Sequence, residues 1–114
     1  MAGGNQAHGA FGEEQVARWY VARGYEVLAR NWRGRNGELD LVVGRPGVVV
    51  FCEVKARATT AFGTPFEAVT SAKQSRLRRL AAEWLASSGT RARELRFDVA
   101  AVLSGKVEVL EAAF

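Results

Sequence analysis

The sequence predicts an α/β domain in which a mixed sheet packs against helices, with the element order α-β-β-β-α-β-β. Two observations carry this prediction. Two runs rich in β-branched residues, 39–43 and 48–54, flank a Gly- and Pro-containing turn and indicate an antiparallel hairpin. A helical segment then separates the second run from an apolar run at 95–103. A strand–helix–strand crossover favours parallel pairing of the two strands that it joins.

The remaining elements follow from local signals. Residues 9–23 carry apolar side chains at helical spacing and predict a helix, which ends at Gly24. Residues 25–31 alternate weakly and predict a first strand, followed by a basic loop at 32–36. That loop, with Trp32, can clamp a phosphate backbone or stack on an unpaired base. Alternatively, Trp32 closes the edge of the core.

The second half contains a helix and two strands. Residues 64–67 form a capping box with Pro at the first helical position, and the helical pattern runs to about Ser87. Ser71 offers a second helix start. After the strand at 95–103, a tight turn leads into an alternating strand at 106–110.

Length and composition indicate an ordinary globular protein. The 114 residues suit one domain, expected at 9–114 after a disordered leader at 1–8. No apolar stretch reaches the length of a membrane span, and there is no secretory signal pattern. We therefore expect a cytoplasmic protein with no membrane partner.

The cysteine and histidine counts restrict the chemistry. Cys52 is the only cysteine and His8 the only histidine, so the chain cannot form an internal disulfide. Catalysis by a Ser-His-Asp triad and a His- or Cys-based zinc site are both implausible. Any metal would be held by oxygen ligands, which points to Mg²⁺ or Mn²⁺.

Charged residues interrupt the two strands of the predicted hairpin. Glu38, Asp40, Glu53 and Lys55 lie in or beside runs that are otherwise apolar, where a charge needs a reason. A turn centred on residues 45–46 would place Glu38 opposite Glu53 and make Asp40 and Glu53 diagonal neighbours on one face. Two carboxylates so placed can share a hard cation. The alternative is an edge hairpin with one solvated, charged face.

Two further acidic residues also lie at positions that are otherwise apolar. Glu13 lies on the apolar stripe of the first helix, as a site residue or as an acid favoured by the helix dipole. Asp98 lies between Phe97 and Val99 in a strand that reads as buried. For Asp98 we favour an ion pair with an arginine over metal binding.

The net charge is +4, with a pI near 9.8, and arginine supplies most of the positive charge. A basic domain with a local acidic cluster is typical of a metal-assisted phosphodiesterase. Genomic base bias or thermal adaptation also produces Arg-rich sequences. The basic helix residues are either a solvated face or a DNA-contacting face; they are Lys73, Arg76, Arg78 and Arg79.

A resemblance joins these features. One part of the sequence is similar to the PD-(D/E)XK nuclease motif: Asp40 is followed, after twelve intervening residues, by Glu53-Val54-Lys55. Leu39 stands where the motif name has proline. The wider pattern comprises Gly12-Glu13, Gly37-Glu38-Leu39-Asp40-Leu41, Phe51-Cys52-Glu53-Val54-Lys55-x-Arg57, Lys73-x-x-Arg76 and Arg96-Phe97-Asp98. It resembles the YraN-type family of bacterial endonuclease-like proteins, which is similar to archaeal Holliday junction resolvases. The resemblance covers residues 9–109 and implies a restriction-endonuclease-like fold.

The resemblance also implies roles. Asp40, Glu53, Glu13 and the Val54 carbonyl would hold Mg²⁺ or Mn²⁺, and Lys55 would orient or deprotonate the attacking water. The nucleic-acid contacts would come from Arg33, Arg35, Arg57, Lys73 and Arg76.

The expected function is metal-dependent endonuclease cleavage of DNA, branched or junction DNA included, with DNA favoured over RNA as the partner. Two alternatives stay open, a nucleic-acid-binding module without significant turnover and a structural or protein-interaction domain. Because junction resolvases act as dimers, the resemblance also suggests a homodimer.

Overall fold

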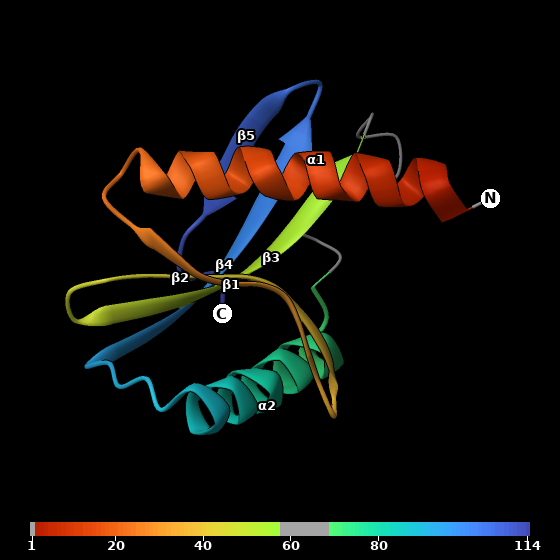
Figure 1. Cartoon of the computed structure of the whole chain (residues 1–114). Coiled ribbons are helices and arrows are strands. Elements are labelled where there is room, and N and C mark those ends of the chain that lie inside the picture. The colour runs from red at the N-terminus through yellow and green to blue at the C-terminus, as the bar shows by residue number, and fades with distance from the viewer. Residues whose placement is uncertain (1, 58–68) are drawn as a thin grey trace.

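The computed structural model describes residues 2–57 and 69–114, and it forms a five-stranded mixed sheet with one helix on each face (Figure 1). The predicted α/β class and element order are confirmed. In chain order the elements are α1 (Ala2–Val21), β1 (Glu26–Gly34), β2 (Gly37–Arg45), β3 (Val48–Arg57), α2 (Ser71–Ser88), β4 (Glu94–Leu103) and β5 (Lys106–Leu110).

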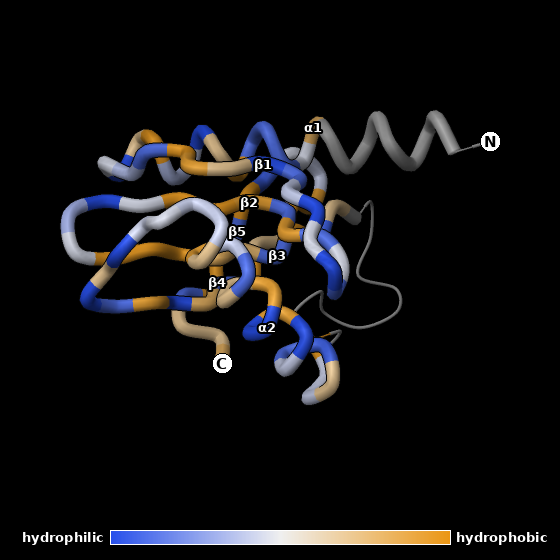
Figure 2. Tube along the Cα trace, turned by 60° about the horizontal axis from the view of Figure 1, so that its bottom comes forward, coloured by the Kyte–Doolittle hydropathy of each residue, from blue (hydrophilic) through white to orange (hydrophobic). Residues whose placement is uncertain are grey.

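The strands lie in the sheet in sequence order, β1-β2-β3-β4-β5. The β3–β4 pair is parallel, as the crossover predicted, and the other three pairs are antiparallel. Figure 2 shows that hydrophobic residues concentrate along the strands. The central strands β2, β3 and β4 are buried because α1 covers one face around Val16 and Tyr20, and α2 covers the other around Leu80 and Trp84.

The end of β1 and the start of α1 differ from those expected. Strand β1 continues to Gly34, so Trp32 and Arg33 lie in a strand and not in a loop. The strand continues because Arg33 pairs with Glu38 and a two-residue turn is enough to connect β1 to β2. Helix α1 begins at Ala2, before the expected start at residue 9, because extending a formed helix costs much less than nucleating one.

Helix α2 begins at the second start signal, with Thr70 as its N-cap. The Thr70 side chain accepts a hydrogen bond from the backbone N–H of Lys73, at 3.2 Å. The capping box at 64–67 lies outside the described residues. Gly89 ends the helix in the left-handed conformation, as a C-terminal glycine commonly does.

The β2–β3 register is shifted by two residues from the expected one. Arg45 pairs with Val48 across the turn Pro46-Gly47, and Gly47 has the positive φ of 89° that such a short turn requires. An even shift keeps every side chain on its predicted face. It does, however, move Glu38 away from Glu53, so the predicted opposition of these two carboxylates is wrong.

A buried polar network anchors β4. Asp98 is 1% exposed and accepts hydrogen bonds from both Nε and Nη2 of Arg96, each at 2.9 Å. The Tyr20 hydroxyl donates to it at 2.6 Å, and the Ala112 backbone N–H donates at 3.0 Å. The predicted arginine ion pair is confirmed, and Asp98 connects α1, β4 and the C-terminal segment.

Among the residues that the structure describes, no helix has the length and apolar character needed to cross a membrane.

Candidate functional site

The candidate site is built on β2 and β3, next to the paired residues Leu41 and Cys52: Asp40 directly precedes Leu41, and Glu53 directly follows Cys52. The backbone N–H of Val54 donates to Oδ2 of Asp40 at 2.9 Å, which holds the Asp40 carboxylate against β3. Burial, and then the negative charge of Glu53, raise the pKa of Asp40 to about 7. The structure therefore brings the two predicted carboxylates together.

Two lysines neutralise Glu53, which is 8% exposed. Lys55 Nζ lies 3.2 Å from Glu53 Oε2, and Lys73 Nζ reaches the same oxygen from the first turn of α2 at 2.5 Å. Burial and the adjacent Lys73 lower the pKa of Lys55. Burial also opposes the charge on Lys73, but its hydrogen bond to Glu53 outweighs this and raises its pKa.

Glu13 approaches the same region from α1, because Gly12 allows the helix to lie very close to β3. A Cβ atom at Gly12 would come within 2.8 Å of the Ala56 Cβ, directly after Lys55. Burial raises the pKa of Glu13; a hydrogen bond with Asn31 opposes this, while the charge of Glu38 adds to it. Asn31 itself has a positive φ of 49° beside this carboxylate.

The donor set for a metal is small. Across residues 2–57 and 69–114, no three His, Cys, Asp or Glu side chains lie close enough together to hold a metal ion. Asp40 and Glu53 remain as a pair of oxygen donors, and Mg²⁺ is often bound by one or two carboxylates together with water and substrate phosphate. The residue types therefore suit Mg²⁺. Val54 contributes its N–H to Asp40 in this structure.

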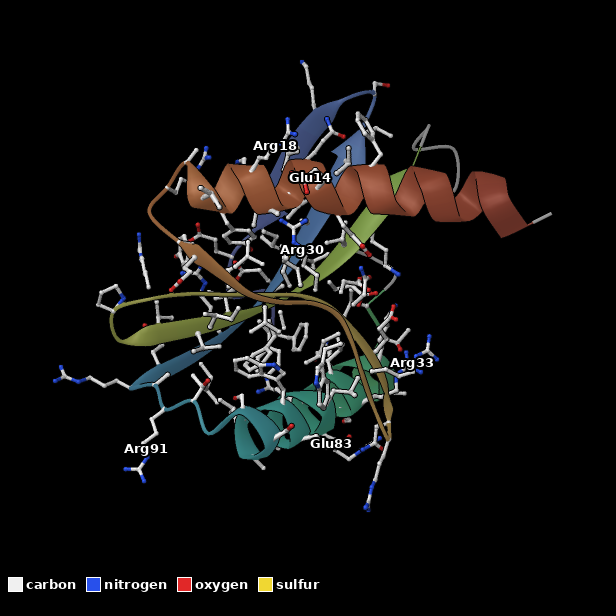
Figure 3. All side chains as sticks on the ribbon, viewed as in Figure 1. Glu14, Arg18, Arg30, Arg33, Glu83 and Arg91 are labelled. Atoms are coloured by element: carbon white, nitrogen blue, oxygen red, sulfur yellow. The ribbon has the colours of Figure 1, made fainter. Side chains whose placement is uncertain are left out.

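The predicted nucleic-acid contacts fall into separate environments. Arg33 and Arg35 are exposed at the β1–β2 turn, and Arg33 lies 3.5 Å from Glu38. Arg76 is exposed on α2, whereas Lys73 is directed to Glu53. The Arg57 side chain lies outside the described residues. Figure 3 shows Arg33 at one end of the sheet and Arg91 at the other.

Sequence reasoning missed Glu83, which connects α2 to the β1–β2 turn. Its Oε1 accepts from the Arg35 backbone N–H at 2.8 Å, and its Oε2 accepts from the Asn36 side-chain amide at 2.8 Å. In the sequence Glu83 is one more charged residue on the polar side of a helix, so no local pattern marks it. Only the tertiary contact gives it a role, which is to hold the turn against α2.

Comparison with known proteins gives the family of this chain. The model of the family described as "Uncharacterised protein family UPF0102" matches residues 12–102, a range that includes Glu13, Asp40, Glu53, Lys55 and Lys73. A UPF0102 protein of Beutenbergia cavernae is 57% identical over 97 residues, covering 85% of this chain and 82% of the relative. A UPF0102 protein of Rhodococcus jostii is 48% identical over 101 residues, covering 89% and 86%. The chain belongs to the UPF0102 family.

Proposed function

We propose that this protein is a metal-dependent endonuclease that hydrolyses phosphodiester bonds in DNA, including branched DNA. The observation that carries the proposal is the arrangement of Asp40, Glu53 and Lys55. Two carboxylates, buried Glu53 and half-buried Asp40, lie on neighbouring strands, and a lysine lies 3.2 Å from Glu53. This grouping is costly in a fold and is typical of sites that handle phosphate and water.

Mg²⁺ or Mn²⁺ would be held by Asp40 and Glu53. The supporting observation is the raised pKa of Asp40, whose first cause is burial and whose second is the charge of Glu53. A divalent cation beside the two carboxylates would remove that penalty. When bound, such an ion lowers the pKa of a coordinated water and neutralises charge on a phosphate oxygen.

The surrounding residues would position the substrate. Lys55, whose pKa is lowered by burial and by Lys73, is suited to orient the attacking water and to exchange a proton with it. Glu13 would accept a hydrogen bond from that water. The flanking phosphates would be bound by three exposed arginines near the β1–β2 turn, which are Arg33, Arg35 and Arg76. A second copy of the chain would supply the second cut at a junction.

A second function is a DNA-binding module that keeps the site without significant turnover. One observation favours it, because Lys55 and Lys73 already neutralise Glu53. In that arrangement the carboxylates would be structural, and the exposed arginines would carry the binding.

The test combines metal binding with cleavage. Calorimetric titration with Mn²⁺ should give saturable binding to the wild type, lost in Asp40→Asn and in Glu53→Gln. Glu108→Gln, which removes an exposed carboxylate from β5, is the matched control and should bind as the wild type does. Purified wild type should cut branched DNA with Mg²⁺, and Asp40→Asn should not. Cleavage by Asp40→Asn would show that the nuclease assignment is wrong. Salt-dependent DNA binding without cleavage by the wild type would select the binding module.

A further inference from the structure

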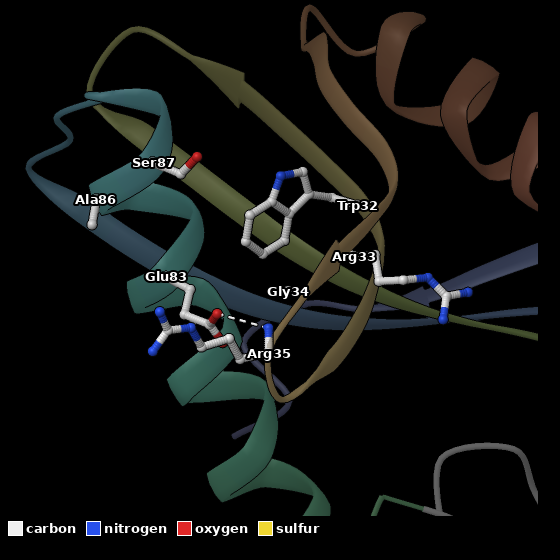
Figure 4. Close-up of a pocket in the computed structure, with 7 residues that line it drawn as sticks. All are labelled: Trp32, Arg33, Gly34, Arg35, Glu83, Ala86 and Ser87. Atoms are coloured by element: carbon white, nitrogen blue, oxygen red, sulfur yellow. Dashed lines mark hydrogen bonds between the residues drawn. The ribbon is translucent and has the colours of Figure 1, made fainter.

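A pocket of about 600 Å³ opens between the β1–β2 turn and α2 (Figure 4). It is lined by Trp32, Arg33, Gly34, Arg35, Glu83, Ala86 and Ser87. Its volume lies in the range of sites that hold small organic ligands. We infer that this pocket binds the base of an unpaired DNA nucleotide. The inference rests on the proposed function and adds a substrate class to it, DNA with unpaired nucleotides near the cut.

One wall of the pocket is an aromatic ring in a defined position. The Trp32 indole lies over Gly34, and a Cβ atom at Gly34 would come within 2.6 Å of ring atom Cζ3. Trp32 is only half-buried, so one side of the indole remains available to a ligand, and Figure 4 shows it between the turn and α2. Stacking on such a ring is the common way in which proteins hold single-stranded bases.

Next to the indole, the pocket offers a fixed acceptor, because a Cβ atom at Gly34 would lie only 3.1 Å from Oε1 of Glu83. Glu83 Oε1 accepts a hydrogen bond from the Arg35 backbone N–H at 2.8 Å, and each carboxylate oxygen can accept two hydrogen bonds. One acceptor position on Oε1 therefore remains for an N–H group of a base. The hydrogen bond from Arg35 also lowers the pKa of Glu83, so the acceptor stays ionised. A flat ring that carries N–H donors at its edge fits both walls.

The position of the pocket relates it to the candidate site. Trp32 pairs with Leu39, and Leu39 directly precedes Asp40. From strand spacing and rise, the Trp32 and Asp40 Cα atoms are roughly 6 Å apart. The pocket therefore lies close to Asp40 on the same pair of strands, and a nucleotide near the bond held there would occupy it. A base stacked and paired within a duplex cannot, because its faces and its Watson–Crick edge are already occupied.

The inference can be tested by binding alone. We would measure fluorescence anisotropy of a labelled 15-nucleotide single strand in EDTA, and of the same strand with one abasic position. Wild type should bind the intact strand more tightly, because stacking of one base on an aromatic ring is worth about 5- to 150-fold in affinity. Trp32→Leu should bind both strands equally, and Trp32→Phe should restore part of the preference.

Trp19→Leu is the matched control, because Trp19 lies on α1, where it contacts Tyr20 and Arg23. It should keep the wild-type preference. Gly34→Ala provides an independent variant that retains the indole but displaces it, and it should also lose the preference. If folded Trp32→Leu prefers the intact strand as the wild type does, the inference is wrong. Asp40→Asn should keep the preference, so the failure of the nuclease proposal would be seen separately, in the cleavage assay.

Discussion

The backbone N–H of Val54 donates to the carboxylate of Asp40 across 2.9 Å, which joins β2 to β3 at the end of their paired register. The same carboxylate is half-buried beside Glu53, and its pKa rises from 3.8 to about 7. The hydrogen bond favours the ionised form, while burial and the neighbouring charge oppose it. The opposing effects are the larger, so the folded protein holds the Asp40 proton more tightly than the unfolded chain does.

Asp40 should therefore make the stability of the metal-free protein fall as the pH rises. Its contribution is fully present below pH 3.8 and is lost as the pH rises through about 7. Asp40→Asn keeps an oxygen acceptor for Val54 and does not ionise. Urea unfolding in EDTA should show that the stability of Asp40→Asn relative to the wild type increases between pH 4 and pH 7, by up to about 4 kcal/mol. A difference that does not change with pH would contradict the burial of this charge.

Lys73 should contribute to stability, and Arg76, one turn later on α2, should not. Lys73→Ala removes a hydrogen bond to the buried Glu53 carboxylate, which we expect to cost about 1–2 kcal/mol. Arg76→Ala removes an exposed charge and should lie within about 0.5 kcal/mol of the wild type. Both replacements add an alanine to the same helix, so helix propensity affects them in the same direction. Equal unfolding free energies for the two variants would show that Lys73 does not hold Glu53 in solution.

Asp98 should be among the most sensitive positions in the chain. Asp98→Ala would remove the buried partner of Arg96 and leave four donor groups without their acceptor, at an expected cost of about 3–5 kcal/mol. Tyr20→Phe removes one of those donors and should cost about 1.5–3 kcal/mol. Thermal unfolding followed by circular dichroism would rank the two. The ranking would be overturned if the loss of the hydroxyl destabilised the protein more than the loss of the carboxylate.

Gly12 sets the distance between α1 and β3. Alanine normally stabilises a helix interior by about 1 kcal/mol relative to glycine, but here its Cβ would lie 2.8 Å from the Ala56 Cβ. We expect Gly12→Ala to destabilise the protein. Adding Ala56→Gly in the same chain should recover most of the loss. A double-mutant cycle of unfolding free energies measures this coupling, and additive effects would argue against the contact.

Local pattern predicted most of this fold from the sequence. The β2–β3 hairpin, the parallel β3–β4 pair and the Asp98 ion pair follow from strand periodicity, crossover topology and the cost of a buried charge. The expected register was wrong by two residues, because the sequence 44–47 is compatible with more than one turn and the positive φ of Gly47 decides between them.

The contacts of Glu53 could be predicted only in part. Lys55 follows from the two-residue period of a strand, whereas the reach of Lys73 depends on where α2 begins. Two start signals were present, and the helix begins at the later one. Glu83 and the pocket beside Trp32 result from contacts between residues about fifty positions apart, for which a single sequence contains no signal.

The strand that carries Glu53 pairs on both sides, with β2 and with β4, whereas β1 lies at the margin of the sheet. Backbone amides of β3 can exchange with solvent only when the whole domain opens, but the β1–β2 turn can open by local fraying. Hydrogen–deuterium exchange should therefore be slowest at Cys52 and Glu53 and much faster at Arg35 and Asn36. The strand that we assign to chemistry is thus protected from local opening, whereas the turn that we propose to bind the bases depends on its hydrogen bonds to Glu83.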